Sequence, residues 1–64
     1  MTTDPTPGLE AASTVLEELR QRITAAADGC LTGGDESGAT ELYEVERSLR
    51  QAARRLRRYL AARA

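Results

Sequence analysis

Arginine is the residue type with the clearest capacity for chemistry in this chain, and it is concentrated at one end. Residues 47–64, RSLRQAARRLRRYLAARA, contain seven arginines and no acid, whereas residues 1–46 contain two arginines and all ten acids. The two parts therefore carry formal charges of +7 and −8, which sum to the net charge of −1. A guanidinium group stays protonated at neutral pH and grips a carboxylate or a phosphate through paired hydrogen bonds. The C-terminal segment is therefore the candidate binding element.

Five of these arginines have the spacing of residues that share one side of a helix. An α-helix turns by about 100° per residue, which places the five opposite a stripe of leucines in the same segment. The predicted partner-binding face consists of Arg47, Arg50, Arg54, Arg57 and Arg58.

Three interpretations of this arginine face stay open. The face can simply be solvated, because arginines suit the negative end of a helix dipole and Glu46–Arg50 and Glu44–Arg47 have the spacing of intrahelical ion pairs. It can bind an acidic protein surface. It can also bind nucleic acid, although the isoelectric point of about 5.3 means that the acidic half repels a polyanion. The function that we favour is a small adaptor or regulator whose protein partner docks either on this face or on a residual apolar edge of Val15, Ala53 and Leu60.

The rest of the chain offers little for catalysis. It has no histidine and a single cysteine, Cys30, so the usual general base, an internal disulfide and a zinc site all lack their residues. We predict that the protein is not an enzyme and uses neither a cofactor nor a metal. Cys30 continues an apolar stripe and is expected to be a small buried hydrophobic residue, with an intermolecular disulfide or a redox-active thiol as the alternatives.

One serine lies in a glycine-rich segment, GGDESGATEL, at position 37. This segment resembles the serine region of peptidyl carrier domains, where a Gly-Gly-x-Ser-Leu motif presents the serine to a phosphopantetheine arm. Here an extra residue precedes Ser37 and Gly38 follows it, and the chain beyond is shorter than the two further helices of such domains. The resemblance implies a remote alternative function, modification at Ser37. We otherwise expect a flexible loop in which Ser37 is a candidate N-cap.

The elements that position these residues are predicted to be helices. The composition is rich in leucine, alanine, arginine and glutamate, which form helices well, so we expect an all-α fold. Residues 1–6 are predicted to be a disordered lead, followed by a helical hairpin over residues 7–64. Thr6 and Pro7 favour the start of a helix over about 7–28, which Gly29 would end. A loop over about 29–37 and a second helix over about 38–62 complete it.

Apolar residues recur at alternating steps of three and four along both predicted helices. Such spacing gives each helix one apolar stripe, and the second stripe is wide enough for a bundle rather than a narrow coiled-coil seam. The predicted hairpin or dimer seam consists of Leu9, Leu16, Leu19, Ile23, Leu42, Val45, Leu49, Leu56, Tyr59 and Leu60, with Ala12, Ala26, Cys30 and Ala52 completing the two stripes.

A short loop makes the two helices antiparallel neighbours, with Leu16 near Leu56 and Ile23 near Leu49. A lone hairpin of 64 residues has no closed core, and no disulfide or metal is available to stabilise it. We therefore expect homodimerisation into a four-helix bundle, with helices of another protein as the alternative partner. Parallel and antiparallel docking of two hairpins fit the pattern about equally.

The sequence also bears on location. No apolar run reaches the length of about 18 residues that a membrane span needs, and MTTDPTPG lacks the features of a secretory signal. We expect a cytoplasmic protein that does not bind membranes.

Overall fold

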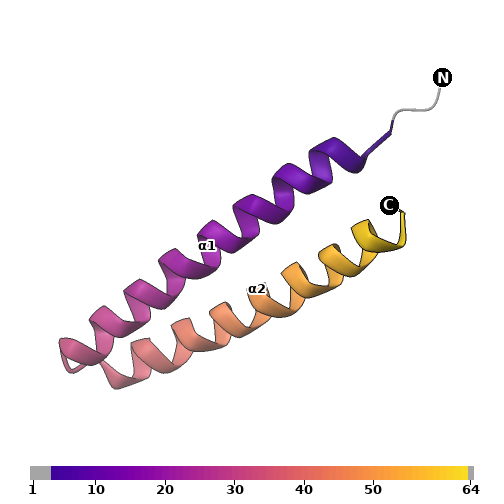
Figure 1. Ribbon diagram of the computed structural model, residues 1–64. Coiled ribbons are helices and arrows are strands. Elements are labelled where there is room, and N and C mark those ends of the chain that lie inside the picture. Colours follow the sequence, from indigo (N-terminus) through magenta and orange to yellow (C-terminus); the bar gives the residue numbers. More distant parts are fainter. Residues whose placement is uncertain (1–3, 64) are drawn as a thin grey trace.

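The computed structural model describes residues 4–63, which form two long helices joined by a tight turn. Helix α1 spans Thr6–Thr32 and helix α2 spans Glu36–Ala62. They lie side by side and antiparallel along a rod of 53 × 16 × 15 Å (Figure 1). Within the described residues there is no strand. The prediction of an all-α antiparallel hairpin is confirmed.

The start of α1 differs in detail from the prediction. The N-cap position is Pro5, and Thr6 is already helical. The carboxylate of Asp4 accepts a hydrogen bond from the backbone N–H of Thr6 at 3.0 Å, and this bond lowers the pKa of Asp4. The side chain of Asp4, rather than that of Thr6, therefore satisfies a free N–H at the start of the helix. Of the predicted disordered lead, residues 1–3 lie outside the described residues.

The turn is much shorter than the predicted loop over 29–37, because α1 continues through Gly29 to Thr32. The helix ends in a Schellman motif, in which Gly34 has a positive φ of 84°, Gly34 N–H donates to Leu31 O and Asp35 N–H donates to Cys30 O at 2.8 Å. A residue with a β-carbon would be strained at Gly34, so the stop is Gly34 and not Gly29.

The second helix starts directly after this motif. Asp35 is its N-cap, and its carboxylate accepts a hydrogen bond from Gly38 N–H at 2.9 Å. The prediction of Ser37 as a candidate N-cap is therefore wrong: Ser37 lies exposed in the first turn of α2. One residue, Asp35, closes the first helix and opens the second, which leaves Gly33–Asp35 as the whole connection.

The two helices contact each other along a line of small residues. Ala27, Ala39 and Ala53 are the buried apolar residues, and no large side chain among the described residues is fully buried. Alanines let the backbones approach closely. Larger side chains flank them and are half-buried: Leu9, Leu16, Ile23, Leu42, Leu49, Leu56 and Leu60.

Three residues of the predicted seam turn outward instead. Leu19, Val45 and Tyr59 are 37%, 44% and 37% exposed, and Arg20 and Glu46 take the adjacent places on the contact line. The reason is geometric: an apolar stripe wider than about 100° cannot face one neighbouring helix entirely. One half of each stripe packs inside the hairpin, and the other half is left uncovered.

Candidate interaction surfaces

The best-buried charge in the described chain is Glu46 of α2, which is 5% exposed. Its Oε2 atom lies 3.0 Å from Nη1 of Arg20 on α1 and 2.8 Å from Nη2 of Arg50, one turn along α2. The hydrogen bond from Arg20, and then that from Arg50, lowers the pKa of Glu46. Two guanidinium groups thus compensate one buried carboxylate, and the pair with Arg20 ties the two helices together at mid-length.

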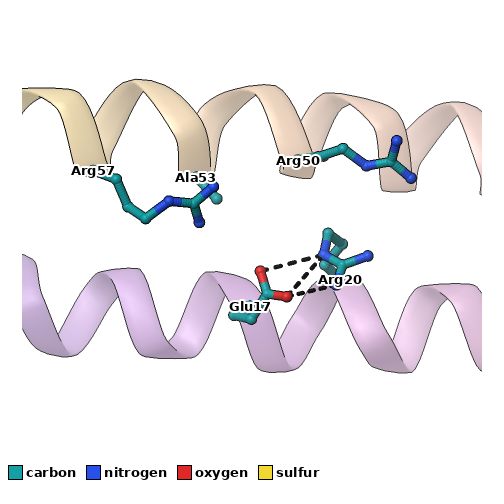
Figure 2. A pocket seen from close by; sticks show the side chains of 5 residues that line it. All are labelled: Glu17, Arg20, Arg50, Ala53 and Arg57. Atoms are coloured by element: carbon teal, nitrogen blue, oxygen red, sulfur yellow. Dashed lines mark hydrogen bonds and ion pairs between the residues drawn. The ribbon is translucent and has the colours of Figure 1, made fainter.

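Glu17 extends this cluster along the same edge of the hairpin. Its Oε1 atom lies 2.5 Å from Nη2 of Arg20, and this hydrogen bond is the main reason that the pKa of Glu17 is lowered. Figure 2 shows Glu17 and Arg20 on α1 facing Arg50, Ala53 and Arg57 on α2 across a shallow hollow. We call this edge, defined by Glu17, Arg20, Arg50 and Arg57, the polar side.

The predicted arginine face is therefore divided. Arg50 and Arg57 border α1 on the polar side rather than lying opposite the helix contact, because the contact line includes Glu46 and Ala53. Arg47 pairs with Glu44 at 3.7 Å, and both side chains are well exposed. The predicted pairs Glu46–Arg50 and Glu44–Arg47 are both confirmed.

The remaining arginines of the face form a separate outer group near the C-terminal end of α2. Arg54 and Arg58 line a second shallow hollow together with Gln51 and Arg55. Within residues 4–63, no carboxylate forms an ion pair with Arg54, Arg55, Arg57 or Arg58. These four side chains are exposed, and their charges are not paired with carboxylates of the described residues.

The opposite edge of the hairpin is apolar. Val15 is 50% exposed, and Leu19 and Val45 are also exposed. On α1, the turn of about 100° per residue places Leu19 and Ala26 on one side of the contact line through Leu16 and Ile23, and Glu17 on the other side. On α2, it likewise places residues 45, 52 and 59 on the side of the contact line opposite to Arg50. We call this edge the apolar side; it comprises Val15, Leu19, Ala26, Val45, Ala52 and Tyr59. Of the predicted residual edge, Val15 lies here, whereas Ala53 is buried on the contact line and Leu60 is half-buried beside it, so that part of the prediction is wrong.

Two aromatic contacts mark the ends of the hairpin. Near the turn, the Tyr43 hydroxyl donates a hydrogen bond to Oδ1 of Asp28, which raises the pKa of Tyr43 and links the helices. At the other end, the guanidinium of Arg63 lies 3.8 Å from the ring centre of Tyr59, a cation–π contact. Cys30 has a free thiol and is half-buried near the turn, so its predicted burial is partial.

Sequence reasoning missed the roles of Arg20 and Glu46. A signal was present, because Arg20 follows Leu16 by four residues and precedes Ile23 by three. Glu46 has the same spacing from Leu42 and Leu49. Opposite charges at equivalent positions of two antiparallel stripes indicate a pair at their contact.

Comparison with known proteins gives no relative: no protein family, curated protein or solved structure matches this chain. Within the described residues, neither helix has a stretch both long and apolar enough to cross a membrane. The function must therefore be inferred from the two sides of the hairpin.

Proposed function

We propose that this protein is a small non-enzymatic interaction module, an adaptor or regulator, that homodimerises through its apolar side into a four-helix bundle. The observation that carries this proposal is a core of three alanines with no large side chain fully buried. Such a core leaves the leucines half in water, and a second hairpin on the apolar side would cover them.

The surface area of the chain supports the same conclusion. Its accessible surface is 4831 Å². A compact monomer of 6.9 kDa is expected to expose about 4,000 Å². The excess, about 800 Å², is the area that one partner loses in a protein interface of standard size.

The second part of the proposal is a protein partner at the arginine face. When the apolar side is covered, Arg54, Arg57 and Arg58 stay outside the bundle, and no carboxylate within residues 4–63 forms an ion pair with them. A protein with an acidic surface would supply those carboxylates through paired hydrogen bonds.

The alternative partner is nucleic acid. It is favoured by the outer hollow, where Arg54, Arg55 and Arg58 lie together beside Gln51 and could contact several phosphates. The acidic groups near the turn oppose such binding.

Sedimentation equilibrium over a tenfold range of concentration, with circular dichroism alongside, tests the dimer. We expect a helical dimer for the natural chain and a monomer for Val45→Asp, which places a charge on the apolar side. Thr40→Asp is the matched control, because it adds the same side chain at an exposed position of α2 away from that side. A natural chain that is monomeric throughout, or equal dissociation of both variants, would contradict the proposal.

Fluorescence anisotropy separates the two partners. The probes are a polyglutamate peptide, which represents an acidic protein surface, and a short single-stranded RNA. We expect the peptide to bind and its affinity to fall when Arg54, Arg57 and Arg58 are changed to glutamine, with Arg47→Gln as the control. Tight RNA binding that weakens about 10²-fold between about 50 and 200 mM salt, as expected for about six phosphate contacts by a dimer, would instead favour the nucleic-acid function.

A further inference from the structure

Charge is distributed unevenly along the axis of the hairpin. The two chain ends lie together at the end opposite the turn (Figure 1), so residues 4–15 and 54–63 form one end and residues 24–45 form the other. The turn end carries five acids and no base. The open end carries five arginines and two acids. The rod is therefore an electric dipole, with a charge of −5 at the turn end and +3 at the open end.

This polarity distinguishes between the two ways of docking two apolar sides. A two-fold axis parallel to the helices would place turn against turn and open end against open end, so that like charges meet. A two-fold axis perpendicular to the helices would place each turn end against the partner's open end. Opposite charges then meet, and α1 packs on the partner's α1 and α2 on the partner's α2, both antiparallel.

The sizes of the side chains on α2 agree with the second arrangement. Val45 and Ala52 are seven residues apart on the apolar side of α2, and both are exposed. In an antiparallel α2 pair, Val45 of each copy lies opposite the partner's Ala52, so each large side chain meets a small one. On α1, Leu19 lies at the midpoint of Thr6–Thr32 and would meet its own copy at the axis.

The border of the apolar side repeats this complementarity in charge. Glu41 and Arg55 lie on one face of α2, two heptads apart and seven residues on either side of Ser48. Both side chains are exposed. An antiparallel α2 pair centred near Ser48 brings Glu41 of each copy close to the partner's Arg55, which gives two opposite-charge pairs along the border formed by the two α2 helices.

We infer that two copies of this chain dock antiparallel, with the turn end of each hairpin against the open end of the other and with α2 packed on the partner's α2. The register places Val45 opposite the partner's Ala52. This inference rests on the proposed dimer and adds its orientation and register.

Orientation is measured by the distance between two spin labels, one on each copy. The label is placed at Thr32→Cys near the turn, with Cys30→Ser to leave a single thiol, and sedimentation and circular dichroism check that the labelled chain is a helical dimer. An antiparallel dimer separates the two labels by most of the 53 Å length of the rod. A short label–label distance in a dimer would overturn the inference and leave the proposed dimer intact, whereas a monomer would contradict both.

Register is tested by exchanging the two side chains. Val45→Ala leaves a gap in both copies, and Ala52→Val crowds both copies, so each single variant is expected to weaken the dimer severalfold. The double variant Val45→Ala/Ala52→Val restores one large and one small side chain at each crossing, and its dissociation constant is expected to return to near that of the natural chain. A double variant in which the two losses simply add would show that Val45 does not meet the partner's Ala52.

Discussion

Two exposed leucines that lie on different sides of the hairpin provide the sharpest test of the proposed dimer interface. Leu19 lies on the apolar side and is 37% exposed, whereas Leu31 lies near the turn, outside the apolar side, and is 50% exposed. The change to glutamine keeps the size of both side chains nearly constant. Leu19→Gln is expected to weaken the dimer, and Leu31→Gln is expected to leave it unchanged.

The expected magnitude follows from the area that Leu19 still exposes. Full burial of a leucine side chain contributes about 1.5–3 kcal/mol, so burial of the remaining 37% contributes about 0.6–1.1 kcal/mol per copy. A dimer contains two copies, and the loss is therefore about 1.1–2.2 kcal/mol. Because about 1.4 kcal/mol is tenfold in affinity, the dissociation constant should rise about 6- to 40-fold. An amide left without a hydrogen-bond partner in the interface would raise it further.

Sedimentation equilibrium measures the two dissociation constants directly, and circular dichroism at high concentration checks that both variants stay helical. Equal effects of the two substitutions would refute the assignment of the apolar side, because Leu31 exposes more apolar surface than Leu19. A weaker dimer for Leu31→Gln alone would place the interface on the polar side.

Four further outcomes are expected. The lowered pKa of Glu46 means that its carboxylate stabilises the fold above about pH 4.3, the ordinary pKa of glutamate, and that this contribution disappears as pH falls through the lower pKa of the folded state. Glu46→Gln should therefore melt at a lower temperature than the natural chain at pH 7, as measured by circular dichroism, and should lose less stability on acidification. Glu17, whose pKa is also lowered, accounts for part of the loss that remains. Gly29→Ala should stabilise the hairpin by about 0.8–1 kcal/mol in urea unfolding, because α1 runs through this position and there is open space around it. Gly34→Ala should destabilise the hairpin by about 1–2 kcal/mol, because Gly34 has a positive φ. A loss of stability in Gly29→Ala would mean that α1 ends before this residue. Dimer affinity should fall as salt rises from about 50 to 500 mM, since screening weakens the attraction between turn and open ends, and an affinity that rises with salt would favour the parallel arrangement. A phosphopantetheinyl transferase with coenzyme A should leave the mass of the protein unchanged, because the described residues form two helices and not the further helices of a carrier domain, and a mass gain on Ser37 would support the carrier-like function.

The sequence was sufficient to predict the helices and their antiparallel pairing. The three-and-four spacing from Leu9 to Cys30 and from Leu42 to Tyr59 allows only a helical stripe, and the glycines before Asp35 leave one place for the chain to reverse. Seven of the ten predicted seam residues are half-buried, because one edge of each apolar stripe does face the other helix.

The tertiary structure decided how far each helix is rotated. Periodicity assigns a residue to a stripe but does not say which edge of a wide stripe faces the neighbour. Here the small side chains of Ala27, Ala39 and Ala53 are buried in the contact between the helices. That contact brings Arg20 and Glu46 onto the contact line and leaves Leu19 and Val45 in solvent.

The two candidate interaction surfaces therefore depend both on the sequence and on the packing of the helices. Sequence alone determined that the arginines gather near one end and that apolar residues exceed what a single hairpin can bury. Rotation of the helices decided which arginines compensate a buried carboxylate, as Arg50 does, and which are left for a partner, as Arg54 and Arg58 are. The physical reason is that charge and apolar area belong to the residues themselves, whereas the side of the hairpin on which each residue lies depends on how closely the two backbones can approach.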